Sequence, residues 1–251
     1  MDDDYTDATY GDRIAEIYDE RYVGSFEEDT SRAVTFLKGF ASGGPALELG
    51  IGTGRVALPL ASEGVEVHGI DASQAMVDRL RAKPGGEVIP VTIGSFSEFA
   101  LPNRFPLIYV VFNTFFGLLT QDEQVSCMQA VSRHLTPDGV FVMQAFVPNL
   151  SRFEAWGRQR VSAESIGVDH VSLEVSKVDP FTQRTDSQHV VIRGGELRMY
   201  PVRIRFAYPS ELDLMAKISG LRLRERWSDW GRSSFPSGAW QHISVWEPAS
   251  D

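Results

Sequence analysis

The sequence predicts an α/β fold built on a doubly wound, mainly parallel sheet of seven strands. Three observations support this prediction. A short apolar run at 45–49 ends at three alternate glycines, Gly50, Gly52 and Gly54, and a helical segment follows. Apolar runs and amphipathic helical segments then alternate along the first half of the chain, which is typical of β-α-β units. After residue 151 apolar and polar residues alternate, which indicates antiparallel strands with one wet face.

Each element follows from the spacing of its apolar residues. Helical spacing predicts helices over 10–22, 27–40, 56–61, 72–80 and 120–135, and a last helix that starts at 208. Continuous or alternating apolar runs predict the strands 45–49, 65–71, 87–93, 106–112, 140–146, 221–227 and 239–246. The segments 172–178, 184–192 and 197–206 predict an inserted antiparallel sheet, with a hairpin turn at Gly194-Gly195. We therefore expect a single domain over 1–251, with an N-terminal helical lid at 1–40 and an insertion at about 151–207.

The charge and cysteine content of the chain indicate which classes of partner it can bind. The chain has 251 residues and a net charge of −10, from 34 acidic and 24 basic side chains. Nucleic-acid affinity comes largely from Lys and Arg at phosphates, so we expect no nucleic-acid partner and favour a small neutral or cationic substrate. The one cysteine, Cys127, excludes an internal disulfide and fits a reducing compartment. With an Asp-rich N-terminus and no apolar run near the ~20 residues that span a bilayer, we expect a cytoplasmic protein without a membrane partner.

The glycine turn predicts a ligand site. A strand, a glycine turn and a helix start present backbone N–H groups to a ligand, and glycine lets that ligand approach the main chain. The dinucleotide fingerprint would need a glycine at position 55, where Arg55 stands. Glu48 precedes the first glycine by two residues, and Asp71 ends the second strand about twenty residues later. An acid there suits ribose hydroxyls, although a generic nucleotide-binding turn would fit as well.

Glu48-x-Gly50-x-Gly52-x-Gly54 and Asp71 resemble motif I and its partner acid in class I S-adenosylmethionine (SAM) methyltransferases. The resemblance implies a Rossmann-like fold, SAM as cofactor, S-adenosyl-L-homocysteine as product, and no metal. It places the glycine turn against the methionine part of SAM and the acid at the ribose. Ser95 stands where the family usually has an acid for adenine, so we expect a weaker or shared contact there. The implied cofactor-binding residues are Tyr18, Glu48, Gly50, Gly52, Gly54, Arg55, Asp71, Ala72, Ser95 and Phe96.

Aromatic and polar residues predict the acceptor side. Tyr10 and Tyr18 lie in the lid, where each could line the site or serve as a buried anchor. Asn113 and Phe116 follow the fourth strand, whose carboxyl end should face the transferred methyl group. The lid, this segment and the insertion resemble N-methyltransferases of antibiotic biosynthesis, of the amino-sugar or lincosamide type. That resemblance implies Tyr10, Tyr18 and Phe116 near the acceptor, and we take all four residues as candidate catalytic residues.

The chemistry favours an amine acceptor. Methyl transfer needs alignment of nucleophile, methyl and sulfur and exclusion of water, whereas a carbon or phenol acceptor usually also needs a base. The segments expected to face the methyl group contain no such base; His68, His170, His189 and His242 lie in strands or in the insertion. The alternatives are an O-methyltransferase with a base within 160–200, or a SAM-binding fold with non-methylating chemistry. The exposed edges of the inserted sheet also predict a homo-oligomer.

Overall fold

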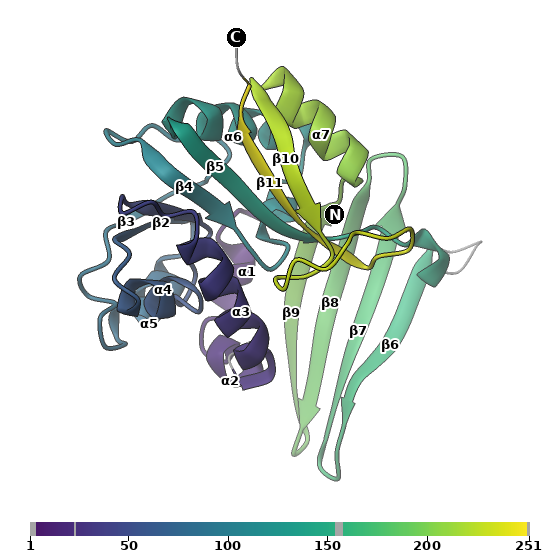
Figure 1. Cartoon of the computed structure of the whole chain (residues 1–251). Helices are drawn as coiled ribbons and strands as arrows, with labels where there is room; N and C mark the ends of the chain where they lie inside the picture. The colour runs from purple at the N-terminus through teal and green to yellow at the C-terminus, as the bar shows by residue number, and fades with distance from the viewer. Residues whose placement is uncertain (1–3, 23, 154–157, 250–251) are drawn as a thin grey trace.

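The computed structural model describes residues 4–22, 24–153 and 158–249, and it is built on the predicted seven-stranded sheet (Figure 1). The strand order is β10-β11-β5-β4-β1-β2-β3. β11 pairs antiparallel with both of its neighbours, and the other neighbouring strands pair parallel. The strands are β1 Ala46–Leu49, β2 Val67–Asp71, β3 Val91–Ile93, β4 Phe105–Val110, β5 Leu135–Phe146, β10 Leu221–Trp227 and β11 Gln241–Pro248. The predicted fold class is confirmed.

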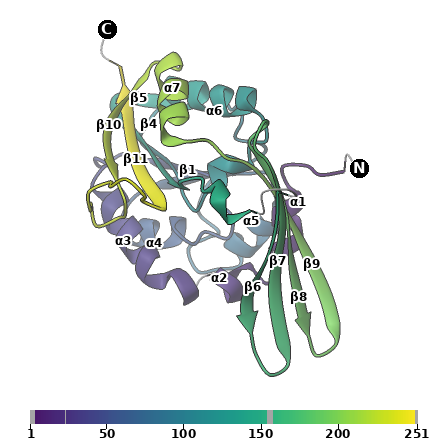
Figure 2. The ribbon, with the colours of Figure 1, turned by 90° about the vertical axis from the view of Figure 1, so that its right-hand side faces the viewer.

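Helices cover both faces of this sheet. α3 Glu27–Lys38 and α4 Ala57–Ser62 pack on one face, while α6 Gln121–His134 and α7 Pro209–Ile218 pack on the other (Figure 2). Side chains of β4 alternate between the two layers: Ile108 joins the α6 and α7 cluster, and Tyr109 joins the α3 and α4 cluster. This double burial explains the near-continuous apolar runs of the parallel strands. α5, at Gln74–Arg81, follows β2.

Two strand boundaries differ from the predicted ones by more than two residues. β3 has three residues instead of seven, because Pro90 lacks an N–H and only its carbonyl takes part, accepting from the Gly69 N–H at 2.9 Å. β5 begins at Leu135, five residues earlier than predicted. The Thr-Pro-Asp-Gly segment is part of β5, and the register of the β4–β5 pair shifts there, between Phe105 and Leu107 of β4.

The inserted sheet is antiparallel, as predicted, and extends away from the rest of the molecule (Figure 1). It consists of β6 Gln159–Ile166, β7 His170–Asp179, β8 Arg184–Arg193 and β9 Glu196–Arg205, in that order. Gly194 and Gly195 join β8 to β9 with φ of 57° and 85°, the conformation of a tight hairpin turn. β6 was not predicted, because its mostly polar sequence lacks clear alternation. Residues 154–157 of the predicted insertion lie outside the described residues.

The N-terminal segment differs most from its prediction, since the expected helix over 10–22 is two helices. α1 Thr9–Ile14 and α2 Tyr18–Tyr22 are separated by a turn in which the Ile17 N–H donates to the Ile14 carbonyl at 2.9 Å. The break allows Ile14 to be fully buried while the Tyr18 and Tyr22 rings pack together at 4.9 Å. A short 3-10 turn, η1 Gly24–Phe26, leads into α3. Residues 1–3 and 23 of the predicted lid lie outside the described residues.

The two lid helices, α1 and α2, are bonded to the loops beside the seven-stranded sheet and to the inserted sheet. The Ser73 hydroxyl donates to Asp12 and the Thr53 hydroxyl to Asp19, each at 2.6 Å. Lys83 forms an ion pair with Asp19 at 2.6 Å. On the opposite side Arg21 of α2 pairs with Glu164 of the inserted sheet. The lid therefore connects the two parts of the molecule. None of the helices within the described ranges is long and apolar enough to cross a membrane.

Candidate active site

A cavity of about 330 Å³ lies between the lid, the inserted sheet and the carboxyl ends of the parallel strands. It lies where the strand order reverses, between β1 and β4, which is the usual ligand position in open α/β sheets. One wall comes from the ends of β1, β2 and β3 and contains Gly50, Gly52, Asp71, Ala72, Ser95 and Phe96. A second wall includes Tyr5, Tyr10, Tyr18, Asn113, His189 and Val202.

The three glycine positions of the turn differ in what a side chain would meet there. All have positive φ, of 72° at Gly50, 55° at Gly52 and 79° at Gly54. A Cβ on Gly50 would lie 2.3 Å from Thr114, and one on Gly54 would lie 2.3 Å from Leu80. A Cβ on Gly52 would meet open space, beside the cavity that Gly52 lines. The turn is thus fixed by packing at its ends and leaves its centre accessible to a ligand.

Asp71 lies at the cavity wall with its carboxylate already oriented. Its Oδ2 accepts from the Gly52 N–H at 2.7 Å, and its Oδ1 accepts from the Ser73 N–H at 2.9 Å. Burial raises the pKa of Asp71, and these two hydrogen bonds only partly oppose that rise. Each carboxylate oxygen has a second lone pair, so Asp71 can accept from two ligand hydroxyls while it holds the turn. Ser95 also lines the wall, and its hydroxyl donates to Ser97 Oγ at 3.0 Å.

Glu48, Gly54 and Arg55 are not among the residues that line the cavity. Glu48 is 2% exposed and accepts from the Tyr109 hydroxyl at 3.0 Å. Burial raises the pKa of Glu48 to about 8, against the Tyr109 hydrogen bond and the charge of Arg55. The Arg55 guanidinium donates to Thr30 Oγ1 at 2.6 Å. Glu48 and Arg55, predicted as cofactor contacts, therefore lie behind the turn.

Tyr10 and Tyr18 both line the cavity, as candidate site residues of the lid. Burial raises the pKa of Tyr18 to about 12, with Arg55 opposing the rise. Burial likewise raises the pKa of Tyr10 well above its usual range, and the neighbouring Tyr22 and Tyr18 add to the effect. Both phenols are therefore neutral near pH 7 and can donate as well as accept hydrogen bonds.

The two candidates after β4 occupy different positions. Asn113 lines the cavity, and its Oδ1 accepts from the Phe146 N–H at 2.7 Å. Asn113 and Phe112 have φ of 65° and 57°, an uncommon conformation for non-glycine residues and one often found at functional sites. Phe116 is fully buried behind the wall, where its ring contacts the Phe146 ring at 5.0 Å. Phe146, and not Phe116, lines the cavity.

Sequence reasoning missed the contribution of the inserted sheet. His189 of β8 lines the cavity, together with Val202 and Ile204 of β9. His189 pairs with Tyr200 across the two strands, so Tyr200, Val202 and Ile204 follow at every second position on the same face. That alternation was a usable signal, but the sequence did not show which face turns inward. Within the described parts of the chain, no three His, Cys, Asp or Glu side chains gather into a metal site.

Comparisons with known proteins identify relatives of this chain. Residues 46–139 match the model of a methyltransferase domain. The solved CcbJ methyltransferase from Streptomyces caelestis is 41% identical with a TM-score of 0.91, over 98% of this chain and 100% of that one. An uncharacterized methyltransferase of Geobacillus is 33% identical over 66% of this chain and 75% of its own length. The cypemycin N-terminal methyltransferase of a Streptomyces species is 28% identical over 72% and 74%.

Proposed function

This chain belongs to the SAM-dependent methyltransferases, and from that premise we propose that it methylates an amine nitrogen of a small natural product. A late step in antibiotic biosynthesis, of the lincosamide or amino-sugar type, fits this proposal. One observation carries it: a single cavity joins the glycine turn and Asp71 to two neutral tyrosines and an apolar wall. A cofactor and an acceptor would meet there.

The residues of the first wall fit SAM by their chemistry. Gly50 and Gly52 would lie against its methionine part, because the open space at Gly52 admits a ligand to the main chain. Asp71 would accept from the ribose hydroxyls with the lone pairs that Gly52 and Ser73 leave free. Ser95 and Phe96 would flank the adenine. Bound SAM supplies a methyl group on a positively charged sulfur, and the protein's part is to align the acceptor nitrogen with it.

The amine assignment rests on the second wall and on charge. Tyr10 and Tyr18 offer neutral phenols to a polar acceptor group, and Asp7 adds a carboxylate to the cavity lining. The net charge of −10 favours a cationic molecule, which an unmethylated amine is near pH 7. The cypemycin relative is named for methylation of an N-terminus, which is also an amine.

The test is methylation of amine-bearing natural products with SAM, with S-adenosylhomocysteine release and the mass of the product as readouts. We expect one or more methyl groups on the nitrogen. SAM binding without turnover across the amine panel would contradict the proposal and favour non-methylating chemistry. O-methylation is the second candidate, because His189, a possible base in the range 160–200, lines the cavity. A methylated hydroxyl in the same mass spectra would identify that reaction.

We also propose that the chain forms a single-domain enzyme and that two or more copies associate through the inserted sheet. The face opposite His189 carries exposed apolar side chains: Val161 (67%), Val175 (42%), Leu197 (60%) and Met199 (54%). Val161 pairs directly with Val175 across β6 and β7, so apolar groups continue from strand to strand. Light scattering should give a mass above that of one chain, and Met199→Lys should lower it. A monomeric wild-type protein would refute this part.

A further inference from the structure

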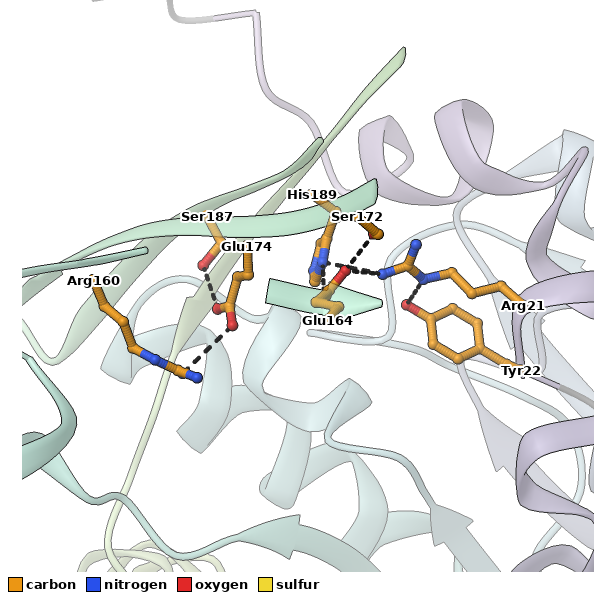
Figure 3. Close-up of polar contacts among 8 residues, drawn as sticks. All are labelled: Arg21, Tyr22, Arg160, Glu164, Ser172, Glu174, Ser187 and His189. Atoms are coloured by element: carbon orange, nitrogen blue, oxygen red, sulfur yellow. Dashed lines mark hydrogen bonds and ion pairs between the residues drawn. The ribbon is translucent and has the colours of Figure 1, made fainter. Parts of the chain in front are cut away.

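A partly buried polar cluster lies between the lid and the inserted sheet (Figure 3), and one of its members, His189, lines the cavity. Its centre is the Glu164 carboxylate of β6, whose Oε1 lies 2.7 Å from His189 Nδ1. The Ser172 hydroxyl of β7 donates to Glu164 Oε2 at 2.8 Å, and Arg21 of the lid forms an ion pair with the same oxygen. The side chains of His189 and Glu164 are 17% and 26% exposed. This cluster presents the His189 ring to the cavity.

The contacts fix which His189 nitrogen carries the proton. Burial favours the protonated form of Glu164, but the Ser172 hydrogen bond and the contacts with His189 and Arg21 outweigh it and lower the pKa of this carboxyl. An ionised carboxylate can only accept, so His189 Nδ1 must donate across the 2.7 Å contact. Arg21 Nη2 lies 3.3 Å from Nδ1, and it is directed to the same carboxylate. In its neutral form the ring therefore keeps the lone pair on Nε2.

We propose that His189, oriented by Glu164, is the general base that removes a proton from the acceptor ammonium group. This inference rests on the proposed function. Nε2 takes the proton, and the nitrogen lone pair forms the new N–C bond. The S–C bond of the cofactor breaks and its electron pair stays on sulfur. The N-methylated product leaves as an ammonium ion, and His189 returns its proton to water. His189 is then a catalytic residue and Glu164 a positioning residue.

The other titratable groups of the cavity suit this role less well. Asp71 already accepts two backbone hydrogen bonds, and the neutral phenols of Tyr10 and Tyr18 have no ready lone pair for a proton. A carboxylate such as Asp7 is intrinsically a weaker base than an imidazole. The charged and titratable groups near His189 come from four elements: Arg21 and Tyr22 of α2, Glu164 of β6, Glu174 of β7 and Tyr200 of β9.

The test compares His189→Gln with His170→Gln, the same substitution on the same sheet. His170 pairs with Asp169 and does not line this cavity, so its variant controls for damage to the sheet. We expect His189→Gln to lower kcat/KM about 100-fold at neutral pH, within the usual range for a general base. The deficit should shrink as the pH rises and the free amine forms in solution. Calorimetry should give wild-type affinity for S-adenosylhomocysteine in both variants, and added imidazole should restore part of the rate of His189→Ala.

The outcomes separate this inference from the proposed function. A His189→Gln variant with the wild-type rate, or with a deficit that is constant at every pH, overturns the inference while amine methylation stands. A wild-type enzyme that methylates no amine refutes both. Should His189→Gln fail to fold, Glu164→Gln takes its place: it should lower kcat more than it changes KM. A wild-type pH profile in that variant would overturn the inference.

Discussion

Glu48→Gln should remove a strong pH dependence of stability. Burial raises the pKa of Glu48 from about 4.5 to about 8 in the folded protein. Between these values the folded protein keeps a proton that the unfolded chain releases, so the free energy of unfolding falls as the pH rises. The difference of about 3.5 units corresponds to about 5 kcal/mol at most, from 1.36 kcal/mol per unit. Glutamine has the same shape, still accepts from Tyr109 and does not ionise.

Urea unfolding of both proteins at pH 5, 6.5 and 8 measures this effect, with Glu63→Gln as control. Glu63 forms its ion pair with Lys38 at the surface, so its variant should keep the wild-type slope. The Glu48→Gln variant should lose stability more slowly with pH and be the more stable protein at pH 8. Equal slopes for wild type and Glu48→Gln would refute the view of Glu48 as a buried, protonated support for the turn.

Three further predictions concern the cofactor, the acceptor and acid stability. Gly52→Val should stay folded, with about 1–2 kcal/mol of strain from φ of 55°. Because the valine side chain enters the cavity, calorimetry should show a SAM affinity at least tenfold lower than that of the wild type. An unchanged affinity would refute the site. Tyr18→Phe should lower kcat about 3- to 10-fold, the value of one hydrogen bond, with SAM affinity unchanged; unchanged kinetics would make Tyr18 structural. Burial, with the charge of Arg226, lowers the pKa of His242 to about 3, so stability should fall as pH drops below about 6.5. His242→Gln should lessen that loss in urea unfolding at pH 7 and pH 4, and an equal loss would contradict it.

The sequence predicted best where the determinants are local. The glycine turn and Asp71 lie within about twenty residues of each other, and the unit of strand, turn, helix and strand brings them to one wall. The position of Phe116 was harder to predict, because the sequence pattern of an apolar residue after a strand is the same whether the residue lines a cavity or packs behind Phe146. His189 was not predictable as a site residue, since its position depends on the register of β8 and on which face of the inserted sheet turns inward.

The helix break at 10–22 and the missed strand β6 have a similar cause. The spacing of apolar residues suggested one helix, but contacts with Ser73 and Glu164, each more than fifty residues away, hold α1 and α2 in different orientations. β6 is an edge strand whose polar residues pair with β7 through backbone bonds, which composition does not reveal. In both segments, contacts with residues distant in the sequence determine the structure, and the local sequence pattern does not reveal them.

The lid has a thermodynamic consequence for how cofactor and acceptor binding affect each other. It contributes Tyr10 and Tyr18 to the cavity and is bonded through Asp12 and Asp19 to the cofactor side and through Arg21 to the inserted sheet. A molecule that orders the lid from one side therefore changes the free energy of binding on the other. Linkage makes that effect mutual: the factor by which cofactor tightens acceptor binding must equal the factor by which acceptor tightens cofactor binding.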